Sequence, residues 1–175
     1  MKRLDRESFA TLLRQARIKP RLMRELRFVP EEIDNWDDLE MLAVPTRSKN
    51  EGVLLTQLDD LYIIPYELSI GLKDTATGRA KPVVCDFCYT WQQGGKSGRI
   101  TFRRESDGHT FTYLCCADLR CSLHVRSITS EAAFSRTQLH EDLTTEQRIA
   151  RLKDNLKQLV ITLAIQPAVQ ADSIE

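Results

Sequence analysis

The sequence lacks long apolar runs, and this absence restricts where the protein can act. No stretch approaches the roughly eighteen apolar residues that a membrane-spanning helix needs, so we expect no membrane partner. The N-terminal stretch MKRLDRESFATLL is basic but contains no extended apolar segment, which excludes a typical secretory signal. These absences predict a cytoplasmic protein. Thiols stay reduced in that compartment, so clustered cysteines there indicate metal binding rather than disulfides.

The sequence also lacks a net charge, because 25 basic side chains balance 25 acidic ones. The distribution is nevertheless uneven. Residues 1–30 carry nine Lys or Arg and three Asp or Glu, whereas residues 31–60 carry two and nine. The segment 79–104 carries six basic side chains and one acidic side chain. This basic block predicts contact with RNA or with an acidic protein surface, or else it is an ordinary solvated face.

Several catalytic patterns are missing. The run GGKSG at 94–98 does not have Walker spacing, which argues against a phosphate-binding loop. No H-x-E precedes the C-x-x-C, so the zinc deaminase pattern is excluded. Ser122 and His124 lie close in sequence without an apparent acidic residue to orient the histidine, and we interpret His124 as a residue at the surface or just outside a metal's ligands. We therefore expect no enzyme activity.

The helical patterns lie at the two ends of the chain. Residues 5–27 show an apolar stripe that Pro20 interrupts, which predicts two helical pieces. The acidic segment after Pro30 predicts a short helix or turn. Its inner face would carry Trp36, Leu39 and Leu42. A helix is predicted over residues 144–165, where Thr144 and Gln147 fit a capping box. Its apolar stripe consists of Ile149, Leu152, Leu156, Leu159, Val160 and Leu163.

The strand patterns lie between these helices. Residues 53–72 are rich in β-branched and aromatic residues, with Asp59-Asp60 as the expected turn and Pro65 indicating an edge strand or a strand end. The polar stretch KDTATGRAKP (73–82) predicts a loop. A second hairpin is predicted over 99–114, where ESDG separates two alternating runs. Its core-facing side would carry Ile100, Phe102, Phe111 and Tyr113.

Together with five cysteines in two groups, at 85–88 and 115–121, these patterns predict an α+β fold in which helices flank an antiparallel sheet and a four-cysteine treble-clef zinc finger. We expect a helical segment over residues 1–45 that packs on the same domain. The zinc-finger domain itself would occupy residues 46–166, and residues 167–175 would form a frayed tail.

Five cysteines occur, in two groups on either side of the expected hairpin. Cys85 and Cys88 form a C-x-x-C, and YLCCADLRCSLHVR (113–126) holds Cys115, Cys116 and Cys121. Zinc prefers four ligands in a tetrahedron, and a C-x-x-C, a hairpin and a second cysteine pair near a helix start follow the order of a treble-clef finger. Neighbouring residues in a strand point to opposite faces, so either member of the adjacent pair can face the metal. Four cysteines close the coordination sphere, which predicts one structural zinc.

The cysteine motif resembles that of a known family. The run CADLRCSLHVR (116–126), with the C-x-x-C at 85–88, is similar to the C-terminal treble-clef zinc-finger domain of FusB-type elongation factor G-binding proteins. The run LHEDLTTEQRIARLKDNLKQLV (139–160) is similar to that family's closing helix, and WDDLEMLAVP (36–45) to the segment before its first strands. The resemblance covers residues 30–165. The chain looks like a short form without the N-terminal helical bundle of the resistance proteins.

The resemblance implies functional assignments that spacing alone does not. The family has a single cysteine before the equivalent of Ala-Asp-Leu, which selects Cys116 and leaves Cys115 outside the site. The implied zinc ligands are therefore Cys85, Cys88, Cys116 and Cys121. The resistance proteins bind elongation factor G through this domain and free it from ribosomes stalled by fusidic acid, which implies the same partner for this chain.

We accordingly expect a monomer that binds elongation factor G, with a role in ribosome release or fusidic acid tolerance. The alternative is a treble-clef protein that binds RNA or the ribosome through the basic block at 79–104. The side chains expected to meet the partner are Phe87, Arg103, Arg104, Tyr113 and Arg126.

Overall fold

The fold is organised around an antiparallel sheet, which the computed structural model describes over residues 1–168. Its elements are α1 (Arg6–Gln15), α2 (Pro20–Glu25), β1 (Met41–Pro45), β2 (Glu51–Gln57), β3 (Leu61–Ile70), β4 (Val83–Val84), β5 (Trp91–Gln92), β6 (Ser97–Arg103), β7 (Thr110–Cys116), α3 (Cys121–Val125), α4 (Ser130–Leu139) and α5 (Thr145–Leu163). Short 3-10 turns occur at Pro30–Glu32, Trp36–Asp38 and Gly94–Lys96. This mixture of helices and antiparallel strands confirms the predicted α+β class.

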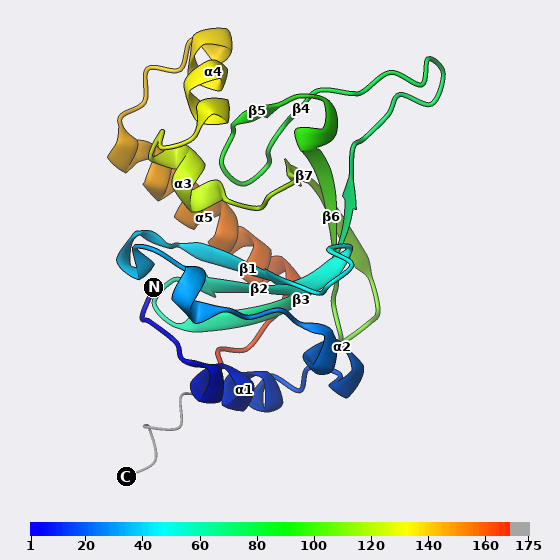
Figure 1. Ribbon diagram of the computed structural model, residues 1–175, viewed down its shortest axis with the longest axis vertical. Helices are drawn as coiled ribbons and strands as arrows, with labels where there is room; N and C mark the ends of the chain where they lie inside the picture. The colour runs from blue at the N-terminus through cyan, green and yellow to red at the C-terminus, as the bar shows by residue number, and fades with distance from the viewer. Residues whose placement is uncertain (169–175) are drawn as a thin grey trace.

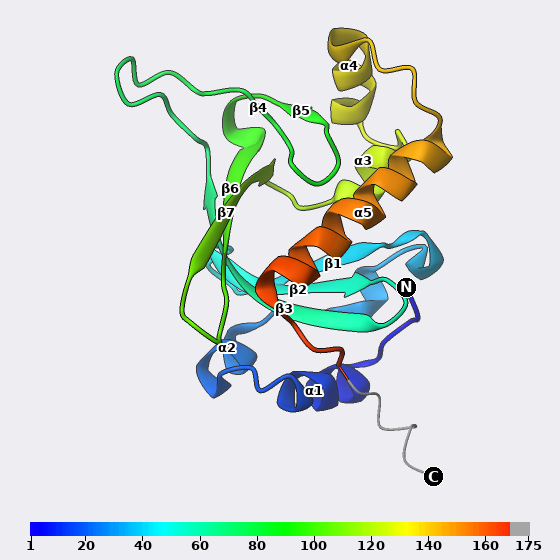
Figure 2. The same ribbon diagram turned by 180° about the vertical axis from the view of Figure 1, so that it is seen from behind.

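The main sheet has five strands in the order β1-β2-β3-β6-β7, and helices cover both of its faces (Figures 1 and 2). Alternate residues of a strand point to opposite faces of the sheet, and β2 is apolar on both faces, so helices must cover both. Val53 and Leu55 pack in the cluster that contains α1, whereas Leu54 packs in the cluster that contains α5. All three side chains are fully buried. We refer to these two clusters as the α1 side and the α5 side.

The helix α5 is the element that the sequence specifies most fully. Thr144 caps its first turn by accepting a hydrogen bond from the Gln147 N–H, and the Gln147 side chain accepts one from the Thr144 N–H, which confirms the capping box. The predicted apolar stripe faces the sheet, with Leu152, Leu156 and Leu159 nearly inaccessible to solvent. Burial of this stripe therefore holds α5 on the sheet.

The N-terminal helices and the turn after Pro30 form as predicted, whereas the end of the segment 1–45 does not. Pro20 occupies the first turn of α2 and separates it from α1. The expected helix or turn beyond Pro30 is present as two 3-10 turns, but Leu42 lies in β1, so the expected helical segment over 1–45 ends in a strand. The strand forms because β1 pairs with β2 along its length.

The first predicted hairpin is present, but Pro65 does not lie where the sequence predicted it. Residues 59–60 turn β2 into β3, as expected. Pro65 lies inside β3, opposite Val53 of β2, rather than at a strand end or on an edge strand. β6 pairs with β3 only from Glu67 to Ile70, so no strand within residues 1–168 faces Pro65 on that side. A central strand can contain this proline because it is paired on one side only at that point.

The second hairpin, β6–β7, confirms the side chains that were predicted to face the core. Ile100 lies opposite Tyr113 and Phe102 lies opposite Phe111 on the α5 side, where the first member of each pair is fully buried and the second is half-buried. The loop expected over 73–82 contains one isolated bridge, Lys73 with Ala80, and extends away from the body of the protein (Figure 1).

The end of the chain is only partly described. The Ala168 N–H donates to the Leu61 oxygen at 2.8 Å, so this residue of the expected tail is attached to β3. The rest of the frayed tail expected over 167–175 falls on residues 169–175, which lie outside the described residues. Among the described residues, no helix is long and apolar enough to cross a bilayer.

Candidate metal centre

Four of the five cysteines meet where the small β4–β5 sheet approaches the end of β7. Cys85 and Cys88 lie in the turn between β4 and β5, which we call the knuckle (residues 85–88). Cys116 is the last residue of β7, and Cys121 is the first residue of α3. The knuckle, the β6–β7 hairpin and the short helix α3 are the three parts of a treble clef.

The four sulfur atoms are spaced as a tetrahedral zinc site requires. The Sγ atoms of Cys85 and Cys121 are 3.7 Å apart, those of Cys88 and Cys116 are 3.5 Å apart, and all four lie within 4.8 Å of one another. Zn–S bonds of about 2.3 Å in a tetrahedron would place the sulfur atoms about 3.8 Å apart. These separations are too long for disulfides, and all five cysteines are free. The arrangement therefore fits one zinc ion on four thiolates.

Nearby polar groups orient the ligand sulfurs. The Gln92 side-chain amide donates to the Cys116 Sγ at 3.3 Å, and the Thr90 hydroxyl is hydrogen-bonded to the Cys88 Sγ at 3.2 Å. Both side chains are buried, so these bonds are protected from water. Sequence analysis missed both residues. Their only signal in the sequence is that two polar residues follow the C-x-x-C closely.

The protonation of the cluster depends on a cation. Burial raises the pKa of the Cys85 thiol, but hydrogen bonds from Cys116 and Cys121 outweigh burial and hold that pKa well below its usual range. Hydrogen bonds from Cys116 and Cys85 raise the pKa of Cys121 well above its usual range. Without an ion, Cys85, Cys116 and Cys121 therefore do not all ionise together. A bound divalent cation supplies the charge that four thiolates require.

Cys115 stays outside the cluster. The four sulfurs that lie together do not include its own, which lies against Gly98, where an added Cβ would come within 3.0 Å of it. Burial raises the pKa of the Cys115 thiol, which keeps this side chain neutral. Spacing alone left Cys115 and Cys116 as alternatives, and the structure brings Cys116 to the other three sulfurs.

The helix α3 ties the metal centre to the edge strand β1. The Ser122 hydroxyl accepts hydrogen bonds from the backbone N–H groups of Glu40 and Met41 at 3.0 and 3.1 Å. Arg126 forms a bidentate ion pair with Glu40 at 2.7 and 2.8 Å, and both side chains are largely buried. The expectation that Arg126 meets a partner is therefore wrong, because its guanidinium is occupied inside the fold.

The aromatic side chains expected to meet a partner belong largely to the core. Phe87 is 1% exposed, and its ring contacts Phe102 and Tyr113 at centroid distances of 6.5 and 5.7 Å. The Asn155 side chain of α5 donates to the Phe87 oxygen at 2.9 Å, which fixes the knuckle against α5. The assignment of Phe87 to a partner surface is wrong for this reason. Tyr113 is half-buried against the same rings.

The two hairpin arginines, Arg103 and Arg104, differ in their exposure and in their contacts within the fold. Arg104 is hydrogen-bonded to Asp107 and to the Thr162 oxygen, and it lies over the Phe111 ring at 5.1 Å. Arg103 is exposed, and none of the ion pairs among residues 1–168 involves it. Of the basic pair, Arg103 is the side chain that the structure leaves accessible to a partner.

His124 is buried rather than at the surface. Its ring nitrogens are hydrogen-bonded to Thr129 at 2.6 Å and to Asp118 at 3.1 Å. The Cys116 sulfur lies within 4.8 Å of the ligand atoms that Asp118 and His124 offer, so the histidine adjoins the metal centre. The sequence did not indicate Asp118 as its partner because the turn at 117–120 brings the two together.

A groove of about 570 Å³ opens between the sheet and the metal centre. Tyr66, Leu68 and Ile70 of β3 line one wall, and Gln92 and Leu119 line the other. The Tyr66 hydroxyl would lie 2.6 Å from a Cβ at position 52, so this wall requires the glycine that is there. The result is an apolar hollow beside the zinc-bearing segment.

Comparison with known proteins agrees with this geometry. Over residues 6–163 the chain matches the family described as FBP C-terminal treble-clef zinc-finger. No curated protein and no solved structure matches the chain. The matched range includes the four cysteines, the β6–β7 hairpin and all of α5. The protein therefore belongs to the FBP C-terminal treble-clef zinc-finger family and carries one structural zinc.

Proposed function

We propose that the protein is a zinc-dependent binding module rather than an enzyme, and that its partner is elongation factor G. The observation that carries this proposal is the family match over nearly the whole chain, together with a four-cysteine centre that has no open coordination position. Its action would be on elongation factor G at the ribosome, with fusidic acid tolerance as a consequence. This proposal places the protein in the cytoplasm as a monomer.

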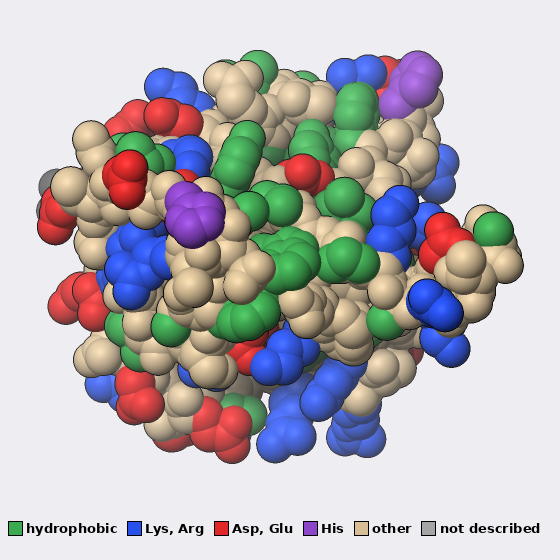
Figure 3. Space-filling view, turned by 90° about the horizontal axis from the view of Figure 1, so that it is seen from above, with side chains coloured by type: hydrophobic (Ala, Val, Ile, Leu, Met, Phe, Trp, Pro, Cys, Tyr) green, Lys and Arg blue, Asp and Glu red, His purple; other side chains and the backbone are tan. Residues whose placement is uncertain are grey.

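An apolar surface supports a binding role. Seen from the end that carries α4 and β5, hydrophobic side chains gather in the centre of the face (Figure 3). Trp91 stacks on Phe134 with centroids 5.6 Å apart and planes at 10°, and Val84 pairs with Trp91 across the β4–β5 ladder. Phe134 is 47% exposed. We call these three residues the knuckle patch, and partly exposed aromatic residues of this kind are typical of protein-binding surfaces.

The zinc ion would support binding by fixing the conformation of this patch. Val84 and Trp91 of the knuckle patch lie on β4 and β5, which are joined by the turn that carries Cys85 and Cys88, and Phe134 of α4 stacks on Trp91. Strands of two residues cannot hold their own geometry, so the zinc ion fixes the surface that they present. The proposed mechanism is therefore presentation of a rigid surface, with no chemical step.

The test is a binding titration of zinc-loaded protein with purified elongation factor G. We expect Phe134→Ser to weaken binding by about tenfold or more, because buried aromatic anchors dominate interface energies. Ile161→Ser is the matched control, since Ile161 is also an exposed apolar residue, 59% accessible, but lies on α5. Absence of any association at micromolar concentration would overturn the assigned partner.

The basic block at 79–104 supports the alternative, an RNA- or ribosome-binding protein. Arg79, Lys81 and Arg99 are exposed. Lys96 and Arg104, however, are paired with Glu131 and Asp107. RNA binding would weaken steeply and log-linearly with salt, whereas a mixed protein interface would depend on salt less. Steep salt dependence with ribosomal RNA, without binding to elongation factor G, would favour this alternative.

A further inference from the structure

Arg148 is a buried cation without a carboxylate partner. It is 5% exposed and lies in the first turn of α5. Its Nε donates to the Val125 oxygen at 3.0 Å, and its Nη2 is hydrogen-bonded to the hydroxyls of Ser127 and Thr145 at 3.2 and 3.0 Å. All three acceptors are neutral, and no ion pair of Arg148 occurs within residues 1–168. A buried charge without a counter-charge is strongly destabilising, so a compensating anion is required.

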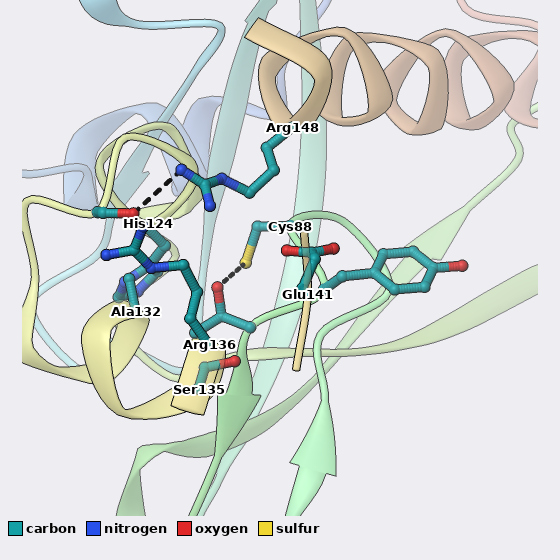
Figure 4. A pocket seen from close by; sticks show the side chains of 10 residues that line it. Cys88, His124, Ala132, Ser135, Arg136, Glu141 and Arg148 are labelled. Atoms are coloured by element: carbon teal, nitrogen blue, oxygen red, sulfur yellow. Dashed lines mark hydrogen bonds between the residues drawn. The ribbon is translucent and has the colours of Figure 1, made fainter. Parts of the chain in front are cut away.

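The remaining nitrogen of Arg148, Nη1, makes none of these bonds. The side chain lines a small cavity with Arg136 of α4 and with the metal ligand Cys88. Figure 4 shows the two guanidinium groups approaching this cavity from α5 and α4, with the Cys88 sulfur across from them. Arg136 lowers the pKa of Arg148, after the larger effect of burial, so the two cations repel each other. Arginine nevertheless stays charged at neutral pH.

The charges around this cavity do not balance by themselves. Tyr89 directly follows the knuckle, and the Arg151 guanidinium lies 4.4 Å from the centre of its ring. Arg151 also forms an ion pair with Glu141 at 2.5 Å. Glu141 lines the same cavity. The charged side chains that line the cavity are thus the guanidinium groups of Arg136 and Arg148 and the carboxylate of Glu141, which leaves about one positive charge. Four thiolates around a divalent zinc ion leave about two negative charges.

We propose that Arg148, assisted by Arg136, is the counter-charge of the zinc–thiolate centre. The buried guanidinium offsets the negative charge that the centre keeps after zinc has bound, and the metal centre in turn makes the burial of Arg148 favourable. Zinc occupancy thereby holds the start of α5 and the helix α4 against the knuckle. This role is independent of which partner the protein binds.

A bound oxyanion would be another way to compensate Arg148, and the size of the cavity argues against it. The cavity has a volume of about 10 Å³ for water-sized probes, which is room for one water molecule. A phosphate or sulfate ion would not enter without movement of α4. Glu141 is already paired with Arg151, so the Cys88 thiolate is the other anionic group that lines the cavity.

The experiment measures the zinc affinity of the full chain by competition with a chelator of known affinity. Arg148→Met removes the charge and keeps much of the apolar stem. Arg148→Lys restores a charge while it loses the forked hydrogen bonds. Lys157→Met is the matched control, since Lys157 is an exposed cation on α5. We expect the methionine variant to bind zinc roughly 10- to 100-fold more weakly, as for other residues that support metal ligands.

Recovery of most of that affinity in Arg148→Lys, with no change in Lys157→Met, is the expected pattern. Equal loss of thermal stability in both Arg148 variants with unchanged zinc affinity would overturn the proposal, because it would assign Arg148 to hydrogen bonding alone. If Arg148→Met does not fold, Arg136→Met decides. Arg136 is exposed, so its replacement spares the core, and an unchanged zinc affinity in that variant would overturn the proposal as well.

Discussion

The two faces of the sheet are stabilised in different ways. On the α1 side the buried residues are apolar side chains from long elements, such as Phe9 and Leu12 of α1 against Val53 and Leu55 of β2. The α5 side buries all five cysteines among its leucines and aromatic residues. The elements that carry the metal ligands are much shorter, since β4 and β5 have two residues each and α3 has five.

This difference shows what the metal contributes. Elements as long as α1 and β2 bury enough apolar surface to hold each other in place. The knuckle and α3 do not, and in such segments the free energy of zinc binding becomes free energy of folding. The α1 side should therefore depend on packing, and the region around the knuckle should depend on zinc.

The largest expected effect is that of removing a ligand. Cys116→Ser should reduce zinc from about one ion per chain to none and unfold the region around the knuckle, since structural zinc contributes about 10 kcal/mol or more in small fingers. Cys115→Ser is the control, because Cys115 faces away from the cluster, and it should keep both metal and fold. Elemental analysis and circular dichroism measure the two outcomes. The opposite pattern would show that the other member of the pair binds zinc.

Truncation of the α1 side should destabilise the protein without affecting the metal. Leu12 is 3% exposed, so Leu12→Ala should cost about 2–5 kcal/mol in the free energy of unfolding. Leu156→Ala on the α5 side should cost a similar amount and also weaken zinc binding, because Leu156 packs in the cluster that holds the ligands. Chemical denaturation and chelator competition on both variants test the contrast. Equal zinc affinities would remove the distinction between the faces.

Loss of the Arg126–Glu40 ion pair, which joins α3 to the start of β1, should have an intermediate effect on stability. Arg126→Met leaves the Glu40 carboxylate buried and unpaired, which should cost about 3 kcal/mol of stability. Arg103→Met removes an exposed arginine and should stay within about 0.5 kcal/mol of wild type. The comparison requires equilibrium unfolding of both variants. A neutral Arg126→Met would return that arginine to the list of partner-binding candidates.

The smallest expected effect is the pH dependence of the stability that the Lys96–Glu131 ion pair gives to α4. The hydrogen bond from Lys96 lowers the pKa of Glu131 to about 2. Because the folded pKa lies below the unfolded value, the ionised pair stabilises the protein above the unfolded pKa of Glu131. That contribution is lost as the pH falls from about 4.5 towards 2. An NMR titration of the Glu131 carboxyl checks this, and Glu131→Gln should abolish the titration while zinc stays bound at neutral pH.

Regular local patterns in the sequence were enough to predict much of the fold. The stripe and capping box of α5 and the alternation of the β6–β7 hairpin appear as predicted. The cysteine groups on either side of the hairpin come together as the spacing suggested. In each case the local pattern and the tertiary packing require the same side chains to face inward, so the sequence is locally consistent with the fold.

Where local pattern and packing disagree, prediction failed. α4 was not predicted because it packs through the small residues Ala132 and Ser135, while Phe134 and Leu139 are exposed, so no inward apolar stripe marks it. β1 was mistaken for helix because a short apolar run fits either period. The burial of Phe87 depends on docking of α5, which no residue near the knuckle reveals.

The Arg126–Glu40 ion pair also has a consequence for folding kinetics. Its two residues are 86 positions apart, whereas the β2–β3 hairpin closes across three residues. The hairpin can therefore form early, and the joint between β1 and α3 must wait for a costly loop closure. Zinc draws positions 85 to 121 together and so shortens the loop that this pair has to close. Refolding should be faster when zinc is present from the start than when it is added afterwards.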